Sequence, residues 1–389
     1  MRARNLARFA AFSVIGSIAL MPLLVLPAMI GVLVDQAGLS ESLAGWSASL
    51  NFFGSALAGL LLSLRIHHLN LRRVGTIALL LAIVADLTSA LAAGPTPLFL
   101  AVRAVAGVVL GAVYVTTAAS FPRFDDYERG FGLFVTLQFV ISGLGLYVVP
   151  VYSDTIGAHG MFIAFAILDA VALVLARALP DEIVARQREV GAKSELHVLL
   201  TLAAGLGILG FALFECANNA QFTYIERFGV SLGLAQHDIG LALLVASLVG
   251  IPGAFTIVVV GHRFGTLAPL TLGMGVAVAG LLVLVGTQSY VGYLAGSCCL
   301  GFSWAYCLPY IQSLLASLDR NGSAIAAGTS LSTLGDAFGP GAAALVVGSG
   351  AYARVFSLAI GFFVITYACF LYAARHSATS AGVPASEHA

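Results

Sequence analysis

The sequence predicts an all-α polytopic membrane protein with twelve transmembrane helices, arranged as two pseudo-symmetric six-helix bundles. Only 9% of the 389 residues are charged, against about 25% in soluble domains, and 60% are hydrophobic. Long apolar runs recur from end to end, many exceeding the ~20 residues that cross a bilayer as a helix. A mean hydropathy of +0.99 leaves too little polar surface to cover a water-soluble globule.

Charges, prolines and glycines divide the chain into its predicted spans. Their limits are 9–33, 42–64, 74–93, 96–121, 130–152, 158–177, 197–225, 237–260, 267–287, 290–318, 322–348 and 351–374. The longest polar break follows the sixth span. It separates an N-terminal bundle (1–179) from a C-terminal bundle with a short tail (197–389), joined by a central loop (180–196). The first run has no clean cleavage site, so a retained helix is expected rather than a signal peptide.

The loop charges predict the orientation. Of the 18 Lys and Arg residues, fifteen fall on the side of the N-terminus, two on the other side (Arg227 and Arg354) and one, Arg103, inside a span. Positive loops face the cytoplasm. Both termini and the central loop are therefore expected in the cytoplasm, and a bacterial inner membrane is the expected location.

The two halves resemble each other. "VLVDQAGLSESLAGW" after the first span aligns with "TYIERFGVSLGLAQHDIG" after the seventh, which places Asp35 over Glu226 and Gly38 over Gly229. Repeats with an even number of spans share one orientation, so their pseudo-twofold axis runs along the membrane normal. A binding site between the halves, near mid-membrane, is the geometric consequence.

Two loops carry a short signature. "HRFG" after the eighth span (His262, Arg263 and Gly265) resembles the D-R-x-G loop of the major facilitator superfamily, and "HHLN" with His67 stands after the second span. With the span count, the 6+6 split and the central loop, the chain resembles this superfamily over essentially its whole length. A histidine replaces the expected aspartate in both copies. Asn70 at the end of the first copy is able to adopt the left-handed conformation that glycine supplies.

An arginine and an aspartate are predicted to meet inside the first bundle. Asp86 and Arg103 lie at similar depths, roughly 11–12 Å from the outer surface at ~1.5 Å per residue, on helices joined by a short hairpin. A structural ion pair and a functional one are both open. "RAVAGVVLGA" also resembles the R-x-x-Q-G-x-G signature of proton-coupled antiporters, with Arg103 and Gly107 matching. In those relatives the arginine faces the cavity and is tied to proton coupling.

Asp336 is the leading candidate for the proton site. It lies about fourteen residues into the eleventh span, and Gly335, Gly339 and Pro340 reproduce the G-x-x-x-G-P spacing of antiporter relatives. A carboxyl group out of water holds a proton more readily than one in water. The alternative is a packing acid bonded to a neighbouring Ser or Tyr. Asp169 in the sixth span and Glu215 are the other buried acids, and the predicted proton-coupling set is Asp336, Glu215, Asp86 and Arg103.

A polar face in the seventh span predicts a cavity wall. Glu215, Asn218 and Asn219 recur at i, i+3 and i+4, so they share one helix face, and Gln221 and Tyr224 extend it outward. Substrate contact and interhelical hydrogen bonding both explain such a face. Aromatic and amide side chains of other spans complete the candidate substrate site: Tyr114, Gln138, Trp304, Tyr306, Tyr310 and Gln312. Such a lining suits small organic molecules of mixed polarity.

These features predict a secondary active transporter that moves a small organic solute by alternating access. Proton-coupled efflux is the expected mode; proton-coupled uptake, or a transport fold acting as a receptor or assembly factor, are the alternatives. Protons, the solute and the lipid bilayer are the expected partners of a monomer. No enzyme activity, cofactor, metal or nucleic acid is expected, since the eight histidines lie in loops, tails or span ends and the net charge is zero.

Overall fold

The computed structural model describes residues 3–121, 127–181, 201–261, 263–318 and 323–380. Over these residues the chain is helical and contains no strand, as predicted. The first half forms α1 (Ala3–Ala19), α2 (Met21–Leu24), α3 (Leu26–Asp35), α4 (Glu41–Ser63), α5 (Leu71–Ala92), α6 (Pro97–Ala118) and α7 (Tyr127–Leu175). The second half forms α9 (Leu202–Ser231), α10 (Gln236–Val260), α11 (Leu267–Gly286), α12 (Tyr290–Leu318), α13 (Ser323–Val347) and α14 (Tyr352–Ser380).

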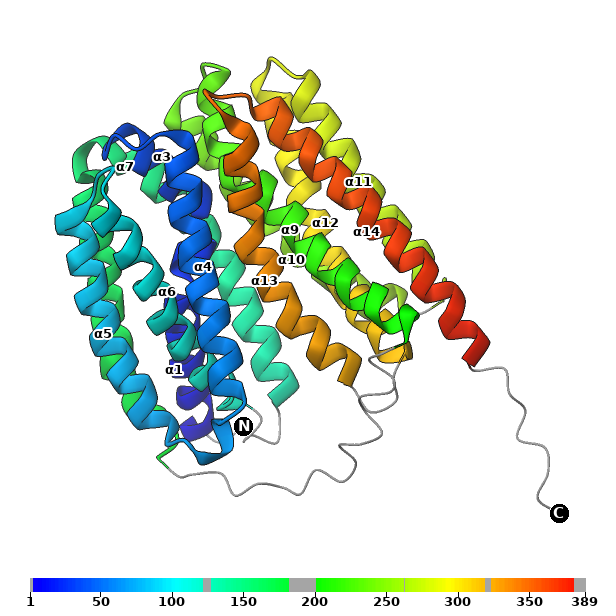
Figure 1. Cartoon of the computed structure of the whole chain (residues 1–389), viewed down its shortest axis with the longest axis horizontal. Coiled ribbons are helices and arrows are strands. Elements are labelled where there is room, and N and C mark those ends of the chain that lie inside the picture. The colour runs from blue at the N-terminus through cyan, green and yellow to red at the C-terminus, as the bar shows by residue number, and fades with distance from the viewer. Residues whose placement is uncertain (1–2, 122–126, 182–200, 262, 319–322, 381–389) are drawn as a thin grey trace.

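The helices pack as two groups that lie side by side (Figure 1). In the first group α4 packs on α6, α6 on α5, and α7 on α5 and α1. In the second, α9 packs on α13 and α14, while α12 packs on α10 and α11. The groups meet where α4 contacts α13, α7 contacts α10 and α3 contacts α9. We call the groups the N bundle and the C bundle.

Nine helices of the described chain are long and apolar enough to cross a membrane. Three departures account for the difference from twelve. Gly157 has φ 62° inside α7, so that segment is two helices that together form the fifth and sixth spans. The first span is broken into α1, α2 and α3. The 25-residue α13 has several hydroxyl side chains and Asp336, which lower its hydropathy.

Two prolines explain the broken first span. Pro22 and Pro27 each lie two residues after a residue outside the helical region, Leu20 (φ −94°, ψ 3°) and Val25 (φ −113°, ψ 20°). Proline lacks the N–H of the helical ladder and its ring clashes with the preceding turn. A continuous span 9–33 was therefore the wrong prediction. The break lies within the N bundle, where neighbouring helices shield its backbone from lipid.

Glycines set the closest helix contacts. A Cβ on Gly107 would lie 1.8 Å from the Asn51 carbonyl oxygen, so α6 and α4 touch backbone to backbone. A Cβ on Gly335 would lie 2.1 Å from the Ala212 carbonyl oxygen, where α13 meets α9. The Gly335 segment therefore packs closely on a neighbouring helix. Small residues allow such approaches between membrane helices.

The predicted repeat register is wrong by four residues. Gly229 lies inside α9, while Gly38 (φ 69°) and Gly233 (φ 75°) share the left-handed conformation. Each stands three residues before the next helix, α4 or α10. The Gly38 turn therefore corresponds to the Gly233 turn, and Glu41 corresponds to Gln236.

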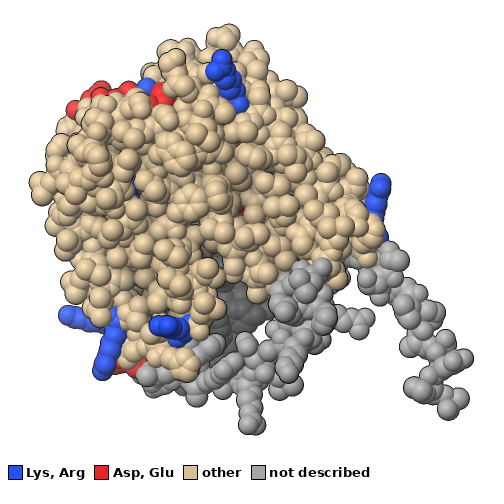
Figure 2. Space-filling model, in the orientation of Figure 1, with Lys and Arg blue, Asp and Glu red and all other residues tan. Residues whose placement is uncertain are grey.

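The surface agrees with a membrane protein. Charged side chains gather toward opposite ends of the molecule, and the face between them is almost free of charge (Figure 2). Large apolar side chains are exposed on the described helices, among them Leu60, Ile77 and Val258. Lipid-facing side chains explain this exposure, because a bilayer rather than water surrounds them.

Candidate functional site

Four side chains form a hydrogen-bonded group where α9, α12 and α13 meet. We call Glu215, Asn219, Trp304 and Asp336 the interface cluster. Asn219 Nδ2 donates to Asp336 Oδ1 at 2.7 Å, and Trp304 Nε1 donates to Glu215 Oε2 at 3.0 Å. Glu215 and Asn219 lie one turn apart on α9, as their spacing predicts, and Asn219 Nδ2 also reaches the Glu215 carbonyl oxygen at 3.2 Å.

The N bundle borders this cluster. Phe139 of α7 meets Trp304 edge to face, with ring centroids 5.9 Å apart. Next to Asp336, Ser49 of α4 donates to the Ala337 carbonyl oxygen at 2.6 Å, and Phe53 contacts Phe338. Glu215 and Asn219 are buried, whereas Asp336 is partly exposed. The cluster therefore lies at the junction of the bundles, where alternating access would move its walls.

The other predicted substrate residues differ in their surroundings. Asn218 bonds within its own helix, donating to the Phe214 carbonyl oxygen at 2.8 Å. Tyr306 stacks on Phe302 and tilts against Tyr310, which puts both tyrosines in the core of the C bundle. Tyr114 and Gln138 are partly buried, Gln221 is buried and Gln312 is exposed.

The predicted ion pair of the N bundle is present. Arg103 Nη1 donates to Asp86 Oδ1 at 2.8 Å and to Ser89 Oγ at 3.2 Å, and its guanidinium lies 4.9 Å from the Phe162 ring centroid. Arg103 is 1% exposed and bonds inside the N bundle. The expectation that it faces the cavity, taken from the antiporter resemblance, is therefore wrong. Its side chain bonds to Asp86 and Ser89 of α5 and lies over Phe162 of α7.

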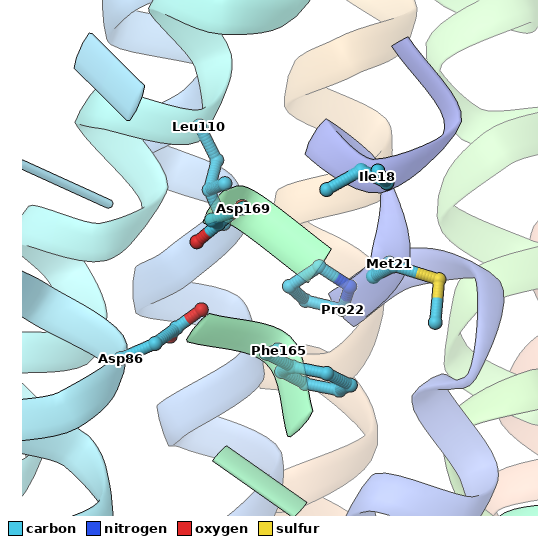
Figure 3. Close-up of a pocket in the computed structure, with 7 residues that line it drawn as sticks. All are labelled: Ile18, Met21, Pro22, Asp86, Leu110, Phe165 and Asp169. Atoms are coloured by element: carbon cyan, nitrogen blue, oxygen red, sulfur yellow. The ribbon is translucent and has the colours of Figure 1, made fainter. Parts of the chain in front are cut away.

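Asp169, which the sequence analysis identifies only as an acid within the sixth span, lies beside this pair. We call Asp86, Arg103 and Asp169 the N-bundle cluster. The carboxyl groups of Asp86 and Asp169 face each other across a narrow crevice that reaches Met21 and Pro22 at the break of the first span (Figure 3). The signal available in the sequence was an acid in the apolar sixth span, but its partner lies on a different helix.

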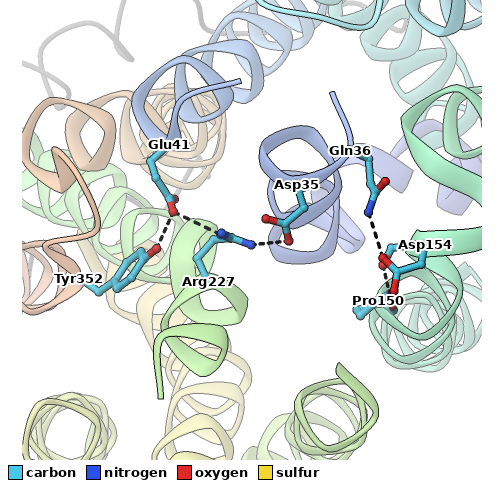
Figure 4. Close-up of polar contacts among 8 residues, drawn as sticks. Asp35, Gln36, Glu41, Pro150, Asp154, Arg227 and Tyr352 are labelled. Carbon is cyan, nitrogen blue, oxygen red and sulfur yellow. Dashed lines mark hydrogen bonds and ion pairs between the residues drawn. The ribbon is translucent and has the colours of Figure 1, made fainter. Parts of the chain in front are cut away.

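A second ion network closes one end of the molecule and was not predicted. Arg227 Nη1 pairs with Asp35 Oδ2 at 2.7 Å, and its Nε pairs with Glu41 Oε1 at 3.3 Å (Figure 4). Tyr352 donates to Glu41 Oε1 at 2.5 Å, and Tyr224 donates to the Glu41 carbonyl oxygen at 2.8 Å. Tyr224, a predicted substrate residue, thus joins the bundles at this end. We call this the closed end.

The signature loops lie at the opposite end. His67 is part of a short 3₁₀ helix, Ile66–His68, and His262 lies outside the described residues. Arg263 stands in a turn in which Gly265 has φ 69°. Asn70 does not use the left-handed conformation open to it: with φ −79° and ψ 105° it caps α5 by accepting from the Arg73 N–H at 2.9 Å.

An aspartate outside these loops anchors the first of them. Arg72 Nη1 pairs with Asp181 Oδ2 at 2.9 Å, and Asn70 Nδ2 donates to Asp181 Oδ1 at 3.0 Å. The hydrogen bond from Asn70 and the charge of Arg72 lower the pKa of Asp181. An acid after the sixth span thus contacts the loop whose own acid is replaced by histidine.

Nothing in these sites indicates a metal centre: no group of three or more His, Cys, Asp or Glu side chains in the described ranges could hold a metal ion. The five cysteines are free thiols, all buried or half-buried. The arrangement is one of buried carboxyl groups, amides and aromatic rings.

Comparisons with known proteins agree with this architecture. A sequence model described as Major Facilitator Superfamily matches residues 7–340. A search of curated proteins gives no significant match. Two solved structures of the nucleoside transporter NupG are similar in fold. A mutant form has a TM-score of 0.78 at 11% identity, covering 94% of this chain and 99% of its own. The other has a TM-score of 0.74 at 13% identity, covering 96% and 99%.

Proposed function

We propose that this chain, a multi-pass membrane transporter that belongs to the Major Facilitator Superfamily, is proton-coupled. It couples the movement of a small neutral organic solute to the movement of protons. The solute binds at the interface cluster while the bundles, 1–179 and 197–389, rock about it. The observation that carries the proposal is the position of Glu215, Asn219, Trp304 and Asp336 at the junction of the bundles.

Two carboxyl groups without a basic partner support the proton coupling. Glu215 and Asp336 accept hydrogen bonds from an indole and an amide, and among the described side chains neither has a Lys or Arg partner. A bare carboxylate at mid-bilayer costs on the order of 3 kcal/mol. A proton removes that cost. Asp336 is the better exchange site because it is partly exposed, whereas Glu215 is buried.

The contacts between bundles support alternating access. Asp35, Glu41 and Arg227 join the bundles at the closed end. Arg72 and Asp181 instead form an ion pair at the opposite end, within the first half of the chain. With the charged loops and both termini in the cytoplasm of a bacterial cell, the closed end faces outward. The structure then corresponds to an inward-facing state.

The polar groups of the site favour a neutral, flat solute with hydrogen-bonding edges. An amide and two carboxyl groups can exchange hydrogen bonds with such a solute, and Trp304 and Phe139 offer ring surfaces. Nucleosides are testable members of this class, and they are what NupG is named for transporting. Efflux is supported by the Gly335–Gly339–Pro340 spacing alone, because Arg103 is buried in the N bundle; uptake is the alternative.

Metabolite profiles of the growth medium test the function and its direction. Cells that express the wild type, the Asp336→Asn variant or an empty vector are compared. We expect a neutral heterocyclic compound to accumulate outside only with the wild type. Selective depletion of such a compound would instead establish uptake. Equal profiles in all three cultures, also after nucleosides are added, would contradict the proposed substrate class.

A further inference from the structure

The N-bundle cluster has more negative than positive charge. Asp86 and Asp169 are each 2% exposed and Arg103 is 1% exposed, so two carboxyl groups share one cation out of water. The helices packed around them add polar but uncharged groups: Ser89 of α5 bonds to Arg103, and Asn51 of α4 donates to the Arg103 carbonyl oxygen. No other charged side chain in the described ranges reaches the cluster.

Water does not supply the missing charge balance. The crevice between the two carboxyl groups is lined by apolar side chains, and it is too narrow to admit a water molecule. Its lining consists of Ile18, Met21, Pro22, Leu110 and Phe165 together with Asp86 and Asp169. A second carboxylate at this depth would face the first one without solvent screening. One of the two carboxyl groups must therefore be protonated.

The hydrogen bonds indicate which one. Asp86 already accepts from Arg103 at 2.8 Å, the geometry of a charge-assisted bond. Asp169 Oδ2 and Arg103 Nη2 are buried and have no hydrogen-bond partner among the described residues. We propose that the N-bundle cluster is a proton-binding site, separate from the interface cluster, in which Asp169 holds an exchangeable proton.

Proton exchange at this site needs only a small rearrangement. When the O–H bond of Asp169 breaks, the proton passes to a water molecule that enters once the crevice opens. Arg103 Nη2 can then donate to the new carboxylate while Nη1 stays on Asp86, so one guanidinium bridges both acids. Met21 and Pro22, at the break of the first span, form one wall of the crevice, and a shift there would open it.

Charge-neutral variants of the purified protein in detergent test this site without any substrate, so the result does not depend on the proposed function. Asparagine mimics a protonated carboxyl group. Asp169→Asn should therefore unfold at about the wild-type temperature in acid and at a higher temperature near neutral pH, where the wild type has to take up a proton on folding. The double variant Asp86→Asn/Asp169→Asn leaves Arg103 buried without a counter-ion and should unfold at a much lower temperature.

The pH dependence identifies the proton. The unfolded chain loses the Asp169 proton above about pH 4, whereas the folded wild type keeps it. From there to neutral pH, the folded-to-unfolded ratio of the wild type should fall by up to tenfold more per pH unit than that of Asp169→Asn. Asp336→Asn, the matched control, should leave this difference in place. Infrared spectra should also show less protonated-carboxyl absorption in Asp169→Asn. The proposal would be overturned if Asp169→Asn and the wild type had parallel pH profiles, or if Asp169→Asn were as unstable as the double variant.

The assignment of the proton to Asp169 would be overturned if Asp86→Asn left the unfolding temperature unchanged while Asp169→Asn lowered it.

Discussion

The protein contains two groups of buried acids that differ in charge balance and in place. The N-bundle cluster has its own cation, Arg103, and lies within one bundle. The interface cluster meets only neutral donors in the described chain, and it lies where the bundles touch. An acid paired inside one rigid group keeps its partners as the bundles move. An acid at the junction changes its surroundings in each cycle. We therefore expect the first group to govern stability and the second to govern transport.

The largest effect should follow from removing the cation of the N-bundle cluster. Arg103→Gln leaves Asp86 buried without its partner, and breaking a buried ion pair costs about 3–5 kcal/mol of unfolding free energy. Thermal and denaturant unfolding in detergent measure this loss. Part of the stability should return at acidic pH, where Asp86 gains a proton. A variant as stable as the wild type would remove the contrast between the clusters.

Asp336→Asn should have the opposite profile. The amide can still accept from Asn219, so the unfolding free energy should change by no more than about 1 kcal/mol. Accumulation of solute against its gradient should fall by about tenfold or more, equivalent to ~1.4 kcal/mol of lost coupling. Transport assays in proteoliposomes with an imposed pH gradient measure this. Full accumulation by the variant would show that Asp336 does not carry the proton.

Trp304→Phe sharpens the assignment of the solute site. It keeps a ring against Phe139 but removes the N–H that bonds to Glu215, a loss of about 1 kcal/mol. We expect the apparent solute affinity to fall about fivefold. Trp46, the other tryptophan, packs against Gly341 on α13 and provides a control in Trp46→Phe. Equal losses in the two variants would argue against a specific role for Trp304.

Arg227→Gln tests the closed end. The side chain of Arg227 is 10% exposed and pairs with Asp35 and Glu41 of the other bundle. Its loss should therefore shift the equilibrium between the closed and the open form of this end toward the open form by about 1 kcal/mol, or ~fivefold. A cysteine placed at the buried Ser49 should then react faster with an impermeant maleimide added from outside. Arg354→Gln, an exposed charge on the same side, is the control. Unchanged labelling would mean that the ion network does not hold this end shut.

The smallest effect concerns Asp181. Because Asn70 and Arg72 lower its pKa below the usual 3.8, the pair stabilises the protein above that pH, and the contribution disappears as the pH falls through the lowered value. Asp181→Asn should therefore unfold at a slightly lower temperature than wild type near neutral pH and at the same temperature in strong acid. A gap that widens on acidification would contradict this sign.

The sequence predicted the features that depend on local pattern. The apolar runs gave the spans, and the i, i+4 spacing of Glu215 and Asn219 gave their common face. The short hairpin before Arg103 also brought Asp86 within reach. These predictions are correct because helical periodicity and hairpin length determine the relative positions of side chains over a few helical turns.

Features that depend on long-range packing were missed. Arg227 and Asp35 are 192 residues apart, and neither position has a local signal for the other. The rotation of α12, which turns Trp304 to the interface and Tyr306 into the C bundle, is set by its neighbours. The prolines of the first span are visible in the sequence. The positions of the breaks, at Leu20 and Val25, nevertheless depend on the helices that pack around them.

Simultaneous measurement of solute and proton flux tests the central claim most directly. Proteoliposomes that contain a pH-sensitive dye receive nucleosides in the absence of a pH gradient. We predict that proton movement accompanies solute movement in the wild type, and that Asp336→Asn still equilibrates the solute but moves no protons. Solute movement without protons in the wild type, or unchanged proton movement in Asp336→Asn, would contradict the account.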